Sequence, residues 1–196
     1  MTEPTLILAS SSPRRAQLLE QIGVAFAQVP QAIDETPAAG ESAEVLAERL
    51  ALEKARAAYA VQDQSECVVL GSDTVVVAGD AILGKPENAD DALRMLALLS
   101  NKSHRVCTAV SLVSGNRSAS RLSVTEVSFR EIEVKEAQAY WATGEPQGKA
   151  GAYAIQGFGA VFVEKISGSY SGVMGLPLYE TAQLLAEFGM PILPPA

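Results

Sequence analysis

The hydrophobic pattern alternates along the chain between short apolar runs and amphipathic segments. Apolar runs bounded by glycine, proline or polar clusters predict buried strands, whereas apolar residues that recur every three to four positions predict helices. The apolar runs predict strands at 5–9, 26–29, 67–70, 75–77, 81–83, 104–113, 121–131 and 161–166. The amphipathic segments predict helices at 13–22, 43–59, 89–100, 135–143 and 177–188. Because helices and strands are interleaved around a hairpin, we expect a mixed-sheet α/β protein with flanking helices.

Local signals support these boundaries. Ser12, Ser42 and Asn88 each precede a predicted helix and are suitable N-caps. In the helix at 43–59 we expect Val45, Leu46, Leu50 and Ala57 to face inward. The glycine-containing segments 71–74 and 168–175 are predicted to be loops.

Composition narrows the class of protein. The chain has 196 residues, of which 48% are hydrophobic and 19% charged, which suits one globular domain spanning 1–196. Its net charge of −8 disfavours extended DNA or RNA as a partner, because proteins that bind nucleic-acid backbones are usually basic. A small anionic ligand is compatible with this charge, since a few basic residues can form a local positive pocket.

We expect neither a signal peptide nor a membrane span in this sequence. The apolar run Leu6–Ala9 precedes the basic pair Arg14 and Arg15, the reverse of the order in a signal peptide. No stretch reaches the ~20 apolar residues that a membrane span needs. Cys67 and Cys107 lie in apolar runs without metal-ligand spacing, and we expect both to be reduced and packed in strands. The expected location is the cytoplasm, with no membrane partner.

The segment SSSPRR at the first strand-to-helix junction is a candidate phosphate site. A helix N-terminus presents free N–H groups and partial positive charge. Capping would explain one serine, but not three serines together with Arg14 and Arg15 in a first turn where the macrodipole disfavours cations. The pattern therefore favours phosphate binding.

Two further candidates are charged residues later in the chain, Asp73 and Lys85. Asp73, in LGSDT, comes directly after an apolar strand, where open α/β sheets bind ligands. There an acid can hold a metal or take a proton from water, although an Asx-turn explains the pattern equally well. Lys85, in LGKPE, is mounted between Gly84 and Pro86 and is a candidate phosphate ligand, although alone it fits a solvated loop lysine better.

The glycine-rich segment KAGAYAIQGFG, which contains Lys149, can form a site wall whose backbone a ligand approaches closely. Within it, the Gln156 amide can recognise a base edge, but by itself the segment is more typical of a turn-rich connection. No GxxxxGK[ST] or early GxGxxG motif is present, and SGSYSG is not a nucleophile elbow. The one histidine, His104, is expected to be structural.

The segments SSSPRR, GSDT, GKP and KAGAYAIQG, followed by GLPL, resemble the Maf (septum formation inhibitor-like) family. The resemblance runs from Leu6 to about Phe188. It implies a nucleoside triphosphate pyrophosphatase whose elongated α/β fold is similar to that of inosine-triphosphate pyrophosphatases, with two lobes around a central cleft. It also implies a divalent cation, Mg²⁺ or Mn²⁺, and a possible homodimer.

The resemblance assigns roles to individual residues. Asp73 matches the proposed proton acceptor, Glu35 an acidic site residue, and Lys85 the loop lysine; these three are the expected catalytic residues. Glu35 and Asp73 are also the expected metal ligands. The expected substrate-binding residues are Ser10, Ser12, Arg14, Arg15, Lys54, Thr74 and Gln156.

One branch of the family is more similar to this chain than the others. That branch acts on dTTP and UTP and has the same residues as Arg14, Thr74 and Gln156, whereas the 7-methyl-GTP branch has an aromatic residue, Gln and Glu there. A Gln amide complements the adjacent N–H and carbonyl of uracil and thymine, while a ring and a carboxylate suit a cationic base. We therefore expect hydrolysis of dTTP and UTP to monophosphate and pyrophosphate.

The expected chemistry is attack of a water on the α-phosphorus. Asp73 orients or deprotonates that water, while Arg15, Lys54 and Lys85 neutralise phosphate charge. Three alternatives remain: a nucleotide-binding regulator of cell division without turnover, a regulator acting on nucleic acid, and a 7-methyl-GTP pyrophosphatase. The paired acids Glu35 and Asp73 favour an enzyme over the first, and the charge of −8 disfavours the second.

Overall fold

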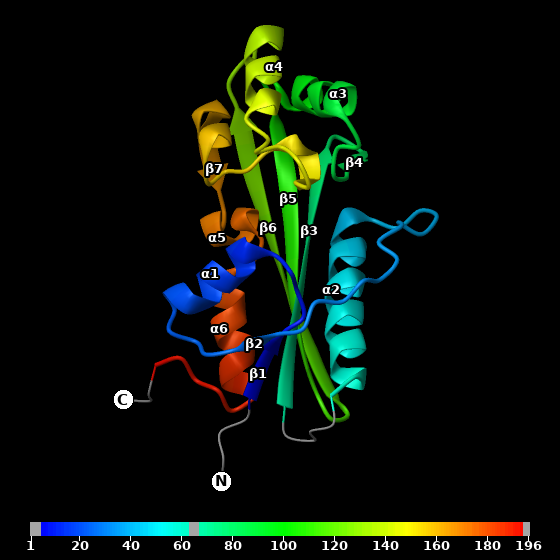
Figure 1. Ribbon diagram of the computed structural model, residues 1–196, viewed down its shortest axis with the longest axis vertical. Helices are drawn as coiled ribbons and strands as arrows, with labels where there is room; N and C mark the ends of the chain where they lie inside the picture. The colour runs from blue at the N-terminus through cyan, green and yellow to red at the C-terminus, as the bar shows by residue number, and fades with distance from the viewer. Residues whose placement is uncertain (1–4, 63–66, 194–196) are drawn as a thin grey trace.

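One mixed sheet runs the length of the elongated molecule, and helices cover both of its faces (Figure 1). The computed structural model describes residues 5–62 and 67–193, so the first four and last three residues lie outside it. The strands are β1 (Thr5–Leu8), β2 (Ala27–Gln28), β3 (Cys67–Ala78), β4 (Ala81–Leu83), β5 (Ser103–Ser114), β6 (Arg117–Phe129) and β7 (Val163–Ser167). The α-helices are α1 (Pro13–Gln21), α2 (Ala43–Ala60), α3 (Ala89–Leu99), α4 (Val134–Ala142), α5 (Tyr170–Met174) and α6 (Leu178–Glu187). Two short 3₁₀ helices, η1 (Ala150–Ala152) and η2 (Phe158–Phe162), lie between α4 and β7.

The sheet combines a small parallel part with a larger antiparallel part. Its strand order is β2-β1-β3-β5-β6-β7, and β4 also pairs with β3. Strand β1 is parallel to β2 and β3, whereas the remaining pairs are antiparallel. The predicted mixed α/β sheet with flanking helices is therefore confirmed.

One edge of β3 is only partly covered. Strand β1 pairs with β3 as far as Leu70, and β4 pairs with it from Val76 onward. Strand β5 pairs with the opposite edge of β3 over 69–77. Strands β1 and β4 therefore both pair with the same edge of β3. Between them, no strand of the described chain pairs with β3, so residues 71–75 form an open stretch of edge.

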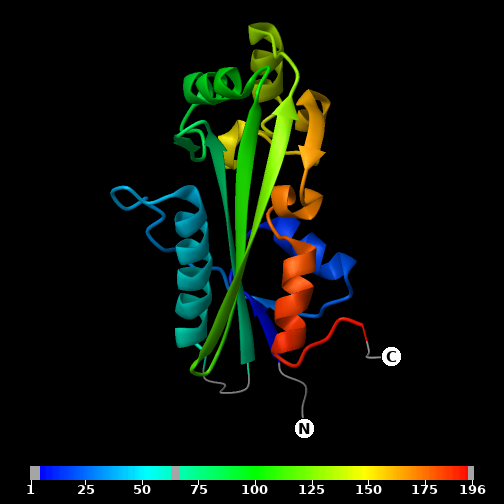
Figure 2. The same ribbon diagram turned by 180° about the vertical axis from the view of Figure 1, so that it is seen from behind.

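The two faces of the sheet carry different helices. Helix α2 packs alone on one face, and α1 and α6 pack on the other (Figure 2). Successive side chains of a strand point to opposite faces. Val75 accordingly packs in the α2 cluster, while Val76 belongs to the larger core on the opposite face.

Helix α2 packs closely on β3 because small residues meet at the contact. Its inward face includes Ala47, Ala51, Ala55 and Ala58, all with no exposed surface. Opposite them stands Gly71, where a Cβ atom would lie 2.1 Å from the Ala51 carbonyl oxygen. This close approach lets a side chain of α2 reach the middle of β3.

The prediction of a loop at 71–74 is wrong, because β3 is one continuous strand from Cys67 to Ala78. Asp73 consequently lies in the middle of a strand rather than at its carboxyl end. The polar residues are tolerated there because each has a tertiary partner. The Ser72 hydroxyl lies 2.8 Å from the Ala109 carbonyl, and the Asp73 carboxylate binds Lys54.

Other predicted boundaries also differ from the structure. Strands β5 and β6 extend to a two-residue turn at 115–116, and the predicted loop at 168–175 contains helix α5. Val45, expected to face inward, is 54% exposed, because the alanine face of α2 takes the contact with the sheet. Ala57 is only partly buried.

We expect Gly71→Ala to lower the free energy of unfolding, because the added methyl would collide with the backbone of α2. Overpacking of this kind costs on the order of 1–3 kcal/mol, and sometimes more. Chemical denaturation monitored by circular dichroism measures the change. Gly84→Ala is the matched control, since nothing lies within 4 Å of a Cβ there. Equal stability of the two variants would show that α2 does not press on Gly71.

Candidate functional site

A cavity of about 700 Å³ opens at the uncovered edge of β3. The loop between β1 and α1 forms one wall, and the end of β4 with the segment before η1 forms another. The lining includes 9–15, 73–76, 82–85, 148–150 and 173–175. Most of the residues selected from the sequence therefore meet in one place.

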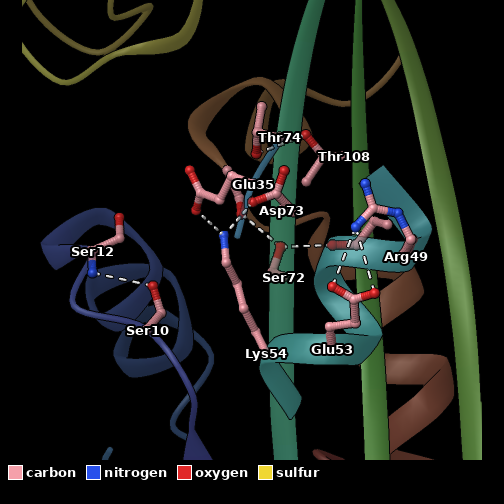
Figure 3. A network of polar contacts seen from close by, with 12 residues as sticks. Ser10, Ser12, Glu35, Arg49, Glu53, Lys54, Ser72, Asp73, Thr74 and Thr108 are labelled. Atoms are coloured by element: carbon pink, nitrogen blue, oxygen red, sulfur yellow. Dashed lines mark hydrogen bonds and ion pairs between the residues drawn. The ribbon is translucent and has the colours of Figure 1, made fainter. Parts of the chain in front are cut away.

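The ammonium group of Lys54 lies between two carboxylates, those of Glu35 and Asp73. It projects from α2, is 7% exposed, and places its Nζ 2.6 Å from Glu35 Oε1 and 2.5 Å from Asp73 Oδ1 (Figure 3). A buried ammonium is stable only when it is paired. Lys54 thus fixes two carboxylates that are distant in sequence at one point of the cavity.

Lys85 extends this network toward solvent. Its Nζ lies 2.9 Å from Glu35 Oε2, and its side chain is 58% exposed. Glu35 therefore accepts from two lysines. Partial burial would raise the pKa of Glu35, but the hydrogen bonds and charges of Lys54 and Lys85 outweigh it and lower that pKa to about 2. The Glu35 carboxylate is consequently ionised at neutral pH.

Arg14 and Arg15, in the first turn of α1, are held by backbone carbonyls. Arg14 Nε donates to the Met174 carbonyl at 3.2 Å, and Arg15 Nε donates to the Gly175 carbonyl at 2.8 Å. Arg15 Nη1 also donates to Ser10 Oγ at 3.1 Å. Neither guanidinium has a carboxylate within salt-bridge distance in the described part of the chain. Burial lowers the pKa of Arg15, and the nearby charge of Asp73 only partly offsets this effect.

The serines of the first motif shape the entrance to α1. Ser10 is buried and accepts from the Ser12 backbone N–H at 3.1 Å. Ser12 occupies the N-cap position, but its side chain makes no capping hydrogen bond. The hydroxyl groups of Ser11 and Ser12 therefore lie at the cavity without a capping role.

Thr74 and Gln156 occupy different positions relative to the cavity. Thr74 lines it on the face opposite Asp73, with its Oγ1 3.2 Å from Thr108 Oγ1. Gln156 is exposed and lies outside the lining residues. Its segment is anchored nearby, because the Glu145 carboxylate accepts from the backbone N–H groups of Phe158 and Gly159. A role for Gln156 in base selection stays a prediction.

Lys149 lines the cavity, although the sequence analysis assigned it no role in the site. It lies beside Gly148 and Ala150 in the lining. Burial, and then the nearby charge of Arg14, lowers the pKa of Lys149. The only signal in the sequence was a lysine within the KAGAY segment. Sequence spacing could not show that Lys149 lies near Arg14.

His104 is structural, as expected. It is 3% exposed, and its Nε2 lies 2.8 Å from the hydroxyl of Tyr153, a cavity-lining residue. Burial lowers the pKa of His104 to about 4, so the ring is neutral at physiological pH. It makes edge contacts with Phe129 and Tyr153.

Carboxylate oxygens are the donors that Mg²⁺ and Mn²⁺ prefer. The described residues contain no cluster of three or more His, Cys, Asp or Glu side chains able to hold a metal alone. Glu35 and Asp73, however, already converge on one cation, the Lys54 ammonium. These two carboxylates are therefore the residues that could hold a divalent ion.

The match to a known family is extensive. Residues 5–188 match the family described as Maf-like protein. The chain belongs to this family. The dTTP/UTP pyrophosphatase of Alkalilimnicola ehrlichii is 56% identical over 189 residues, which cover 94% of this chain and 93% of that one. The dTTP/UTP pyrophosphatase of Pseudoalteromonas atlantica is 52% identical, with 94% and 97% covered.

Two solved structures match this chain at low similarity. The Staphylococcus aureus Ham1 protein has a TM-score of 0.48 and 16% identity, with 94% of this Maf-like chain and 97% of that chain covered. A nucleoside-triphosphatase / dITP/XTP pyrophosphatase from Mycobacterium abscessus has a TM-score of 0.39 and 18% identity, with 65% and 75% covered. Membership of the Maf-like family therefore depends on the sequence matches. No helix in the described parts of the chain is long and apolar enough to cross a membrane.

We expect Lys54→Met to raise the pKa of Glu35 from about 2 toward 4.5, because the variant loses one of the two ammonium groups that favour the carboxylate. Carboxyl ¹³C NMR titration measures the shift. The stabilisation from the lowered pKa is present above pH 4.5 and is lost as the pH falls toward 2. Arg94→Met, at an ion pair away from the cavity, is the control. An unchanged Glu35 pKa in the Lys54 variant would contradict the geometry.

Proposed function

We propose that this Maf-like protein is a nucleoside triphosphate pyrophosphatase that hydrolyses dTTP and UTP to the monophosphate and pyrophosphate. The observation that carries the proposal is the cavity itself, which combines two arginines without carboxylate partners with a carboxylate pair organised by Lys54. The names of the two relatives, each more than half identical over most of the chain, support the same activity.

The cationic residues form the binding site for the triphosphate. Arg14 and Arg15 offer guanidinium N–H groups, which bind phosphate oxygens in pairs. Ser10 and Ser12 add the polar groups of a helix N-terminus to this wall. Lys85 and Lys149 face them from the other wall and neutralise further phosphate charge.

Hydrolysis requires a water placed opposite the leaving pyrophosphate. In our proposal Asp73 orients this water and accepts its proton, and the water attacks the α-phosphorus. Lys54 holds Asp73 in place and stabilises negative charge on the phosphate in the transition state. Breaking of the bond to the β-phosphate then releases pyrophosphate.

Glu35 and Asp73 are the proposed ligands of a divalent cation, Mg²⁺ or Mn²⁺. Bound there, the ion would neutralise phosphate charge and polarise the phosphoryl group. Lys54 would keep the two carboxylates together both with and without nucleotide.

The proposed base site lies on the opposite face of β3. Apolar side chains of Val76, Val106 and Tyr153 line the cavity beyond Thr74 and suit a flat ring. Arg14, Thr74 and Gln156 are the proposed selectivity residues. Gln156 lies outside the cavity lining, so its role in our proposal requires its segment to approach the bound base. A cytoplasmic location and a homodimer remain predictions.

Asp73→Asn should abolish most pyrophosphate release from dTTP, because an amide keeps the shape but cannot accept a proton. Loss of a general base typically costs about 10²–10⁴-fold in rate. The measurement is pyrophosphate release in the presence of Mg²⁺, repeated in excess chelator. Asp80→Asn, the same change at an exposed turn, is the control. An Asp73 variant within a few-fold of the wild type would reject the catalytic role, and turnover in chelator would reject the metal.

Gln156→Glu should reduce the preference for dTTP and UTP over 7-methyl-GTP. The carboxylate cannot donate to a base carbonyl, and its charge favours a cationic base. A base-edge hydrogen-bonding pair discriminates by roughly 1–3 kcal/mol, so selectivity should fall by about one to two decades. Measured kcat/KM values for dTTP, UTP, CTP and 7-methyl-GTP decide this, with Gln183→Glu on α6 as the control. An unchanged ratio would place Gln156 away from the base.

A further inference from the structure

The carbonyl end of α5 faces the arginine pair of α1. The Met174 carbonyl accepts from Arg14 Nε at 3.2 Å, and the Gly175 carbonyl accepts from Arg15 Nε at 2.8 Å. These two acceptors are consecutive in the chain, as are the two arginines. The segment 170–175 therefore determines where both guanidinium groups lie.

Two buried hydroxyl groups fasten this segment to the sheet. Thr108 Oγ1, on β5, donates to the Gly172 carbonyl at 2.8 Å, and Ser72 Oγ, on β3, lies 3.0 Å from the Gly175 carbonyl (Figure 3 shows both side chains). Both residues are 0% exposed, so neither can contact a ligand in solution directly. Their hydroxyl groups can act on the cavity only through their neighbours, which are α5 for both and also Thr74 for Thr108.

The backbone of Gly175 is suited to this arrangement. Its φ of +119° lies in a region that residues with a side chain rarely adopt. That conformation turns its carbonyl toward Arg15 while the chain continues into α6. An added Cβ would lie 3.6 Å from Arg15 Nε, so the guanidinium packs directly against this residue.

Attachment through Nε leaves the other end of each guanidinium available. Arg15 Nη1 donates to Ser10 Oγ, and no other protein partner of an Nη group is present for Arg14 or Arg15 in the described chain. The Nη groups are the fork that binds two oxygens of one phosphate. A tethered arginine also loses less conformational freedom on binding than a free one.

We propose that Thr108 is a positioning residue for substrate, acting through the Gly172 carbonyl and α5 to aim Arg14 and Arg15 at the phosphates. Ser72 acts in the same way through the Gly175 carbonyl. This inference rests on the proposed function, because it takes the arginines as phosphate ligands.

The test compares Thr108→Val, which keeps the shape but removes the hydroxyl, with Thr108→Ser, which keeps the hydroxyl. Pyrophosphate is the probe, because it has no base and so does not respond to the contact between Thr108 and Thr74. Loss of one neutral hydrogen bond should weaken pyrophosphate binding, measured by calorimetry with Mg²⁺, about 2- to 12-fold in the valine variant. The serine variant should bind like the wild type.

A shift of KM for dTTP by the same factor, with a smaller change in kcat, would support positioning. Valine and serine variants with equal affinity would overturn the proposal, as would a valine variant that melts at lower temperature but binds pyrophosphate normally. If Thr108→Val does not fold, Ser72→Ala gives the same test, and normal binding by that variant would overturn the proposal.

A double-mutant cycle identifies the group through which Thr108 acts. In an Arg15→Met background, Thr108→Val should weaken pyrophosphate binding less than it does in the wild type, because the effects of coupled residues do not add. Full additivity would overturn the link to Arg15.

Calorimetry does not require turnover, so a wild-type protein that binds pyrophosphate but does not hydrolyse dTTP would contradict the proposed function and leave the positioning test intact.

Discussion

The open stretch on one edge of β3 determines where the cavity can form. Strand β1 covers this edge up to Leu70 and β4 covers it from Val76, and nothing in the described sheet pairs between them. Neighbouring residues of a strand point to opposite faces, so Asp73 meets Lys54 of α2, while Thr74 lies near Gly175, the residue that follows α5. A ligand at this edge can therefore contact groups from both faces of the sheet, which a ligand lying on a fully paired sheet could not do.

The close packing of α2 on this strand sets the electrostatics of the cavity. Gly71 and the alanines of α2 bring the helix near enough for Lys54 to reach Asp73. A buried ammonium and a buried carboxylate are each costly alone, and pairing Lys54 with two carboxylates offsets both costs. Since Lys54 and Lys85 satisfy Glu35 and Asp73, these acids do not pair with Arg14 and Arg15. Arg14 and Arg15 remain available for an added anion because the two carboxylates of the cavity are already paired with Lys54 and Lys85.

The sequence was sufficient for the mixed α/β class and for most helices, because these depend on local periodicity and on residues close in sequence. It placed Asp73 at the end of a strand because GSDT resembles a turn. The partners that keep this segment extended are Lys54 for Asp73 and Ala109 for Ser72. They lie 19 and 37 residues away, so a local pattern cannot reveal them. The loop predicted at 168–175 failed for a related reason, since the end of α5 is fixed by Thr108 and Ser72. Gln156 illustrates another limit, because a motif does not state how far its side chain lies from the cavity.

The contrast between the whole chain and its cavity explains how an acidic protein can hold a polyanion. The chain has a net charge of −8, yet five cationic side chains and only two carboxylates, Glu35 and Asp73, are among the residues that line the cavity. At physiological ionic strength, charges beyond about 8 Å are largely screened where they are exposed to solvent. The local excess of positive charge therefore dominates for a ligand at the β3 edge, whereas the distant surface acids have little effect there. For the proposed triphosphate site, the same reasoning predicts an order among ligands, because each phosphate removed gives up contacts with the cationic side chains of the cavity. A monophosphate should consequently leave more easily than the triphosphate from which it was made, and the unpaired arginines would both capture the substrate and permit release of the nucleotide product.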